Sequence, residues 1–156
     1  MKNAAHSGAA MRTKNKINIG WRELVALPEL NITCLHAKID TGARSSAIHA
    51  ESLEVFRERG VEMVRFETVA NDERDEIVQC CLPVSARKTV TNSGGQRELR
   101  YFVKTLLVLA DRSWRISLSL TTRHQMRFAM LIGREAMGSH VAIYPNRKYL
   151  AGSPVL

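Results

Sequence analysis

Strand-like segments recur along almost the whole chain, and this pattern restricts the fold more than any other feature of the sequence. Short runs of branched and aromatic residues alternate with turn residues at intervals of about ten residues, which is typical of all-β proteins. The pattern predicts strands near residues 19–27, 35–40, 47–49, 61–69, 77–84, 89–91, 99–109, 114–120, 128–132, 141–144 and 148–150. We therefore expect an all-β fold.

Two short segments favour a helix instead. Good helix formers follow Gly133, and Gly138 would end a helix there. The segment Glu51–Glu58 is predicted to form a second short helix.

The chain has 156 residues, enough for one domain with a hydrophobic core. Residues 1–16 are small, polar and basic, so we expect a disordered tail ahead of a domain over residues 17–156. The tail lacks the apolar segment of a secretory signal, and no apolar run reaches the roughly 20 residues of a membrane-spanning helix. The three cysteines have no disulfide-framework spacing, which fits a cytoplasmic, reducing location.

Charge is unevenly distributed along the chain, whose net charge is +8. Residues 51–76 carry nine acidic and four basic side chains, whereas residues 77–156 carry three acidic and twelve basic ones. The basic C-terminal half is expected to attract an acidic partner, either an acidic peptide or a nucleic acid.

The sequence KIDTGARSSAIHA, residues 38–50, places Asp40 at the end of an apolar strand. An ionisable group is costly there unless the protein needs it. Gly42 lets the backbone approach the carboxylate so that its N–H can donate a hydrogen bond, and the Thr41 hydroxyl can anchor the loop. Two such carboxyl groups about 3 Å apart share one proton and can hydrolyse a peptide bond. The alternative is an ordinary turn.

Other catalytic motifs are missing from the sequence. It contains no GxxxxGKS/T or GxGxxG phosphate loop, no HExxH metal motif and no GxSxG nucleophile elbow. Cys34 and His36 would share one strand face, which is weak geometry for a zinc site. We therefore predict neither a metal nor another cofactor.

A second motif supports a catalytic role for the Asp40 segment. The segment MLIGREAM, residues 130–137, places two apolar residues before Gly133 and Arg134. This order of a DTGA loop and a later apolar-apolar-Gly-Arg segment resembles the retropepsin-like aspartic proteases. Over roughly residues 17–151, the segments IGWRELVALPEL, SGGQRELRYFVKT and YPNRKYL further resemble the RimB-type family, long labelled ATP-dependent zinc proteases. One departure is Tyr144, since the family often has an aspartate before this proline.

The resemblance implies a closed retropepsin-like β-barrel with one or two short helices. It assigns catalytic roles to Asp40, Thr41 and Gly42, and supporting roles to Ala43, Ile132, Gly133 and Arg134. The chain carries one DTG sequence only, so a carboxylate pair requires Asp40 of a second, identical chain. We therefore expect the active site on the two-fold axis of a homodimer.

Retropepsins cover their substrate with a β-hairpin flap, and residues 88–101, KTVTNSGGQRELRY, are the best candidate. The residues expected to bind substrate are Arg44, Lys88, Ser93, Gly94, Gly95, Arg97 and Arg100. If Arg87, Arg123, Arg127 and Arg134 also converge there, a basic groove would select acidic peptides. RimB-type proteins are associated with an ATP-grasp ligase that adds glutamates to a ribosomal small-subunit protein, so the resemblance implies trimming of α-linked polyglutamate tails.

Two other functions stay open. The basic C-terminal half could form a non-enzymatic RNA- or ribosome-binding module, although few aromatic residues are available to stack on bases. A metal-dependent protease is the third possibility, as the older family label suggests.

Overall fold

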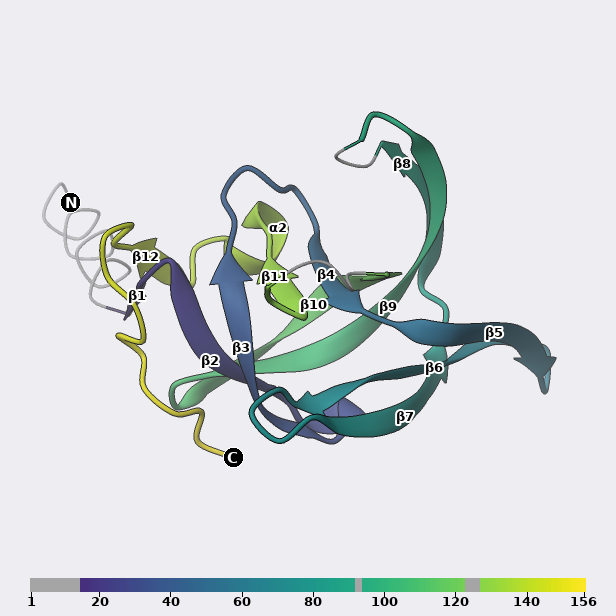
Figure 1. Cartoon of the computed structure of the whole chain (residues 1–156), viewed down its shortest axis with the longest axis horizontal. Coiled ribbons are helices and arrows are strands. Elements are labelled where there is room, and N and C mark those ends of the chain that lie inside the picture. Colours follow the sequence, from purple (N-terminus) through teal and green to yellow (C-terminus); the bar gives the residue numbers. More distant parts are fainter. Residues whose placement is uncertain (1–14, 92–93, 123–126) are drawn as a thin grey trace, which may run out of the picture.

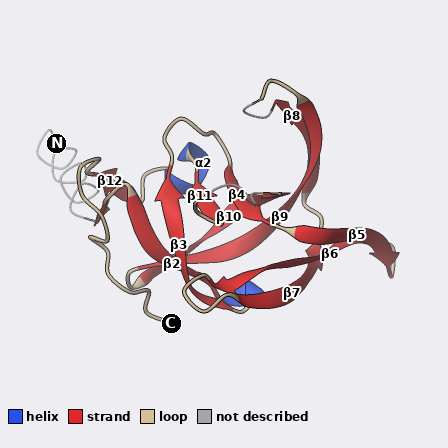
Figure 2. Cartoon of the chain, in the orientation of Figure 1, coloured by secondary structure: helices blue, strands red, loops and turns tan. Residues whose placement is uncertain are grey.

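The computed structural model describes residues 15–91, 94–122 and 127–156. Strands dominate these residues (Figures 1 and 2). In chain order the elements are β1 (Ile17–Ile19), β2 (Arg22–Leu27), the 3-10 helix η1 (Pro28–Leu30), β3 (Ile32–Ile39), β4 (Ser46–His49), β5 (Glu51–Glu58), β6 (Val61–Asn71), β7 (Glu76–Pro83), β8 (Ala86–Thr91), β9 (Arg97–Leu109), β10 (Arg112–Thr121), β11 (Met130–Ile132), α2 (Arg134–Met137) and β12 (Val141–Ile143).

Six of the strands close into a barrel. They follow the order β11-β4-β10-β9-β2-β3, and a parallel pairing of β11 with β3 completes the ring. Closure leaves these six strands without a free edge within the barrel. The predicted all-β fold with a closed barrel is thus confirmed.

Alternating side chains fill the barrel. On β3, Leu35, Ala37 and Ile39 are buried, whereas Lys38 between the last two is exposed. Burying a side chain such as Leu35 contributes about 1.5–3 kcal/mol to the stability of the fold. The core therefore fixes the register of β3, and with it the position of the loop that follows.

A three-stranded extension, which we call the β5–β7 arm, projects from the barrel (Figure 1). Its strand β6 pairs with β5, with β7 and, through Asn71, with Cys34 of β3. The prediction of a helix over Glu51–Glu58 is wrong, because this segment is strand β5. Its local helix propensity is outweighed by pairing with β6, which places Val55 opposite Val64.

The C-terminal segment corrects two other predictions. Residues 148–150 form no strand, because the backbone N–H of Leu150 donates to the buried carboxylate of Glu23 rather than to a neighbouring strand. The expected strand over residues 19–27 is interrupted at Gly20, where a Cβ atom would lie 2.0 Å from the carbonyl oxygen of Arg147. Glu23 also accepts the N–H groups of Gly20 and Ala151, so it joins both segments.

Two local predictions are confirmed by the elements. The short helix α2 follows Gly133 and ends at Gly138, whose φ of +46° suits glycine. Strands β8 and β9 form the expected hairpin, with register from Ala86 opposite Phe102 to Thr91 opposite Arg97. We call it the β8–β9 hairpin; in Figure 1 it rises on the same side of the barrel as the β3–β4 loop and bends toward it.

Several predicted features lie outside the described residues. These are most of the N-terminal tail, two residues of the hairpin turn (Asn92 and Ser93) and Arg123. Within the described residues, no helix has both the length and the apolar character needed to cross a membrane.

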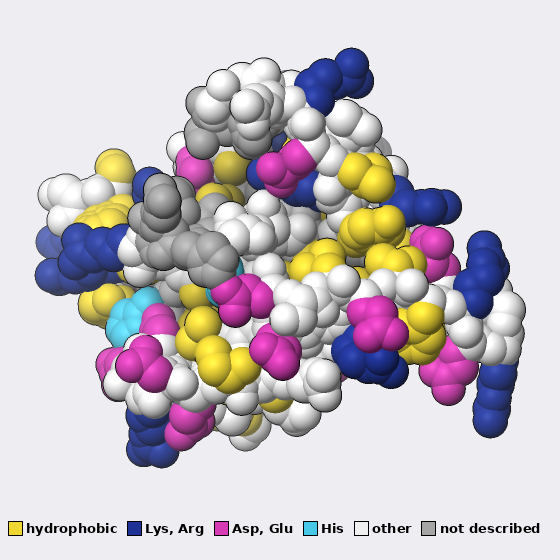
Figure 3. Space-filling view, turned by 45° about the vertical axis from the view of Figure 1, so that its right-hand side comes forward, with side chains coloured by type: hydrophobic (Ala, Val, Ile, Leu, Met, Phe, Trp, Pro, Cys, Tyr) yellow, Lys and Arg dark blue, Asp and Glu magenta, His cyan; other side chains and the backbone are white. Residues whose placement is uncertain are grey.

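Hydrophobic side chains gather on the face between the β8–β9 hairpin and the β5–β7 arm, as Figure 3 shows. The exposed large hydrophobic residues include Leu99 on the hairpin and Leu53 and Val55 on the arm. Figure 3 also shows lysine and arginine side chains on both sides of this face.

Candidate active site

Asp40 lies directly after β3, at the start of the loop that leads to β4. Its own N–H donates to the carbonyl oxygen of Ile132 at 2.9 Å, which ties it to the end of β11. The N–H of Gly42 donates to Asp40 Oδ1 at 3.0 Å, as expected from the sequence. This contact fixes the orientation of the Asp40 carboxyl group within the loop.

The loop is open on its outer side. Thr41, Gly42 and Arg44 are exposed, and Asp40 is half-buried. In the part of the chain that the structure describes, Asp40 has no ion-pair partner, and its second carboxylate oxygen accepts no hydrogen bond. A further carboxylate or a water molecule can therefore reach this side of Asp40.

Gly133 packs against the inner side of the loop. A Cβ atom there would lie 2.6 Å from the carbonyl carbon of Ser45 and 3.0 Å from the carbonyl oxygen of Ala43. The N–H of Gly133 donates to the hydroxyl of the buried Ser46 at 3.0 Å. The close approach of two backbones thus requires glycine at position 133.

The first turn of α2 holds the loop through its backbone and its side chains. The N–H groups of Arg134 and Glu135 donate to the carbonyl oxygens of Ala43 and Arg44, at 2.8 and 3.1 Å. The Arg134 guanidinium donates to the carbonyl oxygen of Thr41 at 2.8 Å. The two sequence motifs, DTGA and IGR, therefore form one structural unit.

The residues expected to bind substrate are divided between the loop and the hairpin. Arg44 is on the loop, where its Nε donates to Glu135 Oε1 at 2.6 Å. Lys88 places its ammonium 4.9 Å from the ring centre of Phe102, and Arg100 forms an ion pair with Glu98 at 2.6 Å. Exposed residues Gly94, Gly95 and Arg97 flank the hairpin turn, and Ser93 lies outside the described residues.

The structure adds residues that the sequence analysis missed. Ser46 supports Gly133 through its hydroxyl, while its carbonyl oxygen accepts the hydroxyl of Ser119 at 3.1 Å. Glu135 contacts Arg44 although the two are 91 residues apart. The only sequence signal for Ser46 is a polar residue within a strand pattern, and that for Glu135 is its helix propensity.

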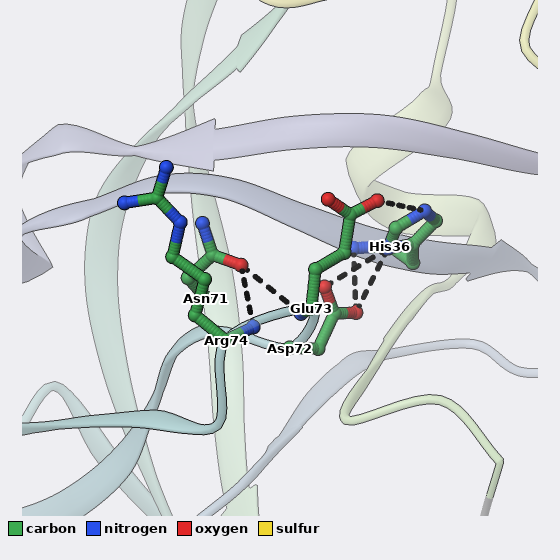
Figure 4. A network of polar contacts seen from close by, with 5 residues as sticks. All are labelled: His36, Asn71, Asp72, Glu73 and Arg74. Carbon is green, nitrogen blue, oxygen red and sulfur yellow. Dashed lines mark hydrogen bonds and ion pairs between the residues drawn. The ribbon is translucent and has the colours of Figure 1, made fainter.

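A separate polar network lies at the middle of β3 (Figure 4). His36 Nδ1 contacts Asp72 Oδ1 at 2.9 Å, and Nε2 lies 3.7 Å from Glu73 Oε1. The two nitrogens therefore face different carboxylates of the β6–β7 turn, which joins this turn to β3. No group of three histidine, cysteine or acidic side chains is arranged to hold a metal ion in the described ranges.

Cys34 also lies on β3, and burial and acidic neighbours favour the protonated form of its thiol. Partial burial is the main cause that raises the pKa of its thiol, and the charges of Asp72 and Glu73 raise the pKa further. A raised pKa keeps sulfur protonated, which disfavours both metal binding and nucleophilic attack by Cys34.

Comparisons with known proteins identify the family of the chain. Residues 18–154 match the family described as RimB-like, retropepsin-like aspartic endopeptidase RimB. Two proteins called probable alpha-L-glutamate ligase are similar in sequence. The one from Shewanella pealeana is 34% identical over 88% of this chain, and the one from Desulfotalea psychrophila is 39% identical over 81%. The chain spans only 30% and 28% of these two proteins.

A solved structure supports the fold alone. The crystal structure of Lpg0085 from Legionella pneumophila, a protein of unknown function, is 23% identical with a TM-score of 0.74. The match covers 86% of this chain and 98% of that protein. Since the family match extends over most of the chain and includes both the Asp40 loop and the Gly133 segment, the chain belongs to the RimB-like family of retropepsin-like aspartic endopeptidases.

Proposed function

We propose that the chain is an aspartic peptidase that acts as a homodimer, with Asp40 of each subunit in a shared active site. The observation that carries this proposal is the Asp40 loop. Its carboxylate is held by the Gly42 N–H and is open on the opposite side, and Gly133 fixes the loop from behind. The chain has a single DTG sequence, so the second carboxylate has to come from another copy.

The chemistry follows from two carboxyl groups that share one proton. The ionised Asp40 accepts a proton from a water molecule, whose oxygen then attacks the carbonyl carbon of the peptide bond. The protonated Asp40 of the other subunit donates its proton to the carbonyl oxygen. When the tetrahedral intermediate collapses, the Asp40 that took up the water proton donates a proton to the leaving amine and the C–N bond breaks. The Asp40 that is now ionised accepts the proton of one hydroxyl group of the intermediate, so the pair again shares one proton.

We further propose that the substrate is an α-linked polyglutamate tail, such as one carried by a ribosomal protein, or a similar acidic peptide. Two observations support this class. The relatives are called glutamate ligases, although the chain corresponds to less than a third of each. Residues 77–156 carry twelve basic and three acidic side chains, which favours an acidic peptide electrostatically.

The test is cleavage of a synthetic α-linked polyglutamate peptide, followed by mass spectrometry. Wild type and Asp40→Asn are compared in the presence of a chelator and without ATP. We expect the wild type to shorten the peptide and Asp40→Asn, which lacks the ionisable group, to leave it intact. Cleavage that persists in Asp40→Asn, or that stops on addition of chelator to the wild type, would contradict the aspartic mechanism.

A further inference from the structure

Arg44 is placed to bind a ligand next to the catalytic loop. It follows Asp40 by four residues, and the turn between them is closed by the N–H of Ala43, which donates to the carbonyl oxygen of Asp40 at 3.2 Å. Its side chain is 79% exposed. The only hydrogen bond that this side chain makes in the described structure runs from Nε to Glu135, so both terminal nitrogens of the guanidinium are free.

Three of the other basic groups expected at the site already have polar partners. Arg134 donates to the carbonyl oxygen of Thr41, Arg100 pairs with Glu98, and Arg87 pairs with Glu62 at 3.5 Å. Arg44 also has an acidic partner, but its two terminal guanidinium nitrogens make no hydrogen bond in the described structure, so it is a cationic group available beside the loop.

The ion pair between Arg44 and Glu135 orients the guanidinium. Glu135 is 50% exposed, and exposed ion pairs add little to the stability of a fold. Its backbone, however, is fixed on the loop, because the N–H of Glu135 donates to the carbonyl oxygen of Arg44. A guanidinium held at Nε presents its two terminal nitrogens as a planar fork that matches a carboxylate.

We propose that Arg44 binds a side-chain carboxylate of the substrate beside the bond to be cleaved, and that Glu135 is the positioning residue that orients Arg44. The ligand class rests on the proposed function. A glutamyl side chain brought close to a pair of aspartates would be repelled by the ionised one. Arg44 offsets this repulsion through charge-assisted hydrogen bonds.

Binding tests this proposal separately from cleavage. Fluorescein-labelled α-linked hexaglutamate and hexaglutamine are titrated with the full chain, and fluorescence anisotropy gives the Kd of each peptide. Every protein carries Asp40→Asn, which prevents cleavage during the titration. Four proteins are compared: Asp40→Asn alone, and Asp40→Asn combined with Arg44→Gln, Glu135→Ala or Glu135→Gln. The matched control is Glu54→Ala, which removes another exposed ion pair, with Arg65 on the arm.

We expect hexaglutamate to bind more tightly than hexaglutamine, and Arg44→Gln to weaken hexaglutamate about tenfold. Glu135→Ala should weaken hexaglutamate about three- to tenfold, whereas Glu135→Gln, which retains an oxygen acceptor for Nε, should restore most of the affinity. None of these three substitutions should alter the Kd of hexaglutamine, and Glu54→Ala should alter the Kd of neither peptide.

Equal affinity for hexaglutamate with and without Arg44 would overturn the proposal, as would tighter binding by Glu135→Ala. If hexaglutamate binds through Arg44 but the wild type cleaves no peptide, the proposed peptidase function fails and the carboxylate site stands.

Discussion

Gly133 is the residue on which the geometry of the catalytic loop depends most directly. A methyl group there would meet the backbone of Ser45 at 2.6 Å, and backbone atoms cannot move aside as a flexible side chain can. We expect Gly133→Ala to destabilise the protein by about 1–3 kcal/mol and to displace Asp40 from its position. Urea unfolding and peptide cleavage would measure the two effects.

Gly60→Ala is the control for Gly133→Ala. Gly60 has a φ of +79° and open space around its Cβ position, on the β5–β7 arm. This change adds about 1–2 kcal/mol of backbone strain without contact with the loop, so cleavage should be retained. Full activity in Gly133→Ala would contradict the assigned packing.

The cysteines provide a second prediction about single residues. Burial raises the pKa of the Cys80 thiol to about 11, whereas the neighbouring Cys81 is exposed. The thiolate is the reactive form, so at pH 8 the folded protein should be alkylated by iodoacetamide at Cys81 much faster than at Cys80. Reaction at Cys80 should increase as the pH rises toward its pKa. Peptide mapping measures both sites, and equal rates at pH 8 would contradict the burial of Cys80.

Part of the site was predictable from single residues, because its motifs are local. The DTGA loop predicted the Gly42 N–H contact with Asp40, and the structure has that contact at 3.0 Å. The role of Glu135 was not predictable, because it depends on a residue 91 positions away. Ser46 and Gly133 are 87 positions apart, so their hydrogen bond could not be predicted from local sequence either.

At the level of elements, the start of α2 acts as the support of the catalytic loop. The Arg134 side chain donates to the carbonyl oxygen of Thr41, an exposed contact that adds about 0.5–1.5 kcal/mol to stability. We expect Arg134→Ala to lower kcat for peptide cleavage about tenfold or more, because the loop loses this anchor, while the unfolding midpoint changes little. Arg65→Ala on the arm, which also removes an exposed arginine, should leave kcat unchanged. Unchanged kcat in Arg134→Ala would contradict the supporting role.

The elements also show where sequence patterns fail. In β3 buried and more exposed residues alternate, and β9 contains a long run of branched apolar residues. Patterns of this kind predict strands from the sequence. Glu51–Glu58 contains residues that suit a helix, and only its pairing with β6 makes it a strand. The break at Gly20 depends on the backbone of Arg147, which comes from the other end of the chain.

At the level of the whole molecule, the closed barrel places the Asp40 loop and the β8–β9 hairpin on one side (Figure 1). A second copy that faces this side would bring two Asp40 carboxylates together. If the active dimer dissociates, specific activity should fall on dilution, in parallel with the dimer fraction measured by sedimentation velocity. Activity that stays constant while the protein becomes monomeric would contradict the need for a dimer.

The most direct test of the central claim, that each active site contains Asp40 of two chains, is the activity of a mixed dimer. Wild-type and Asp40→Asn chains with different affinity tags are co-expressed, and the mixed dimer is purified through both tags. Its cleavage of α-linked polyglutamate is then compared with that of doubly tagged wild-type dimer. We predict loss of nearly all activity in the mixed dimer, because one carboxylate cannot serve as both base and acid. Half of the wild-type activity would contradict the account, since each chain would then carry a complete site.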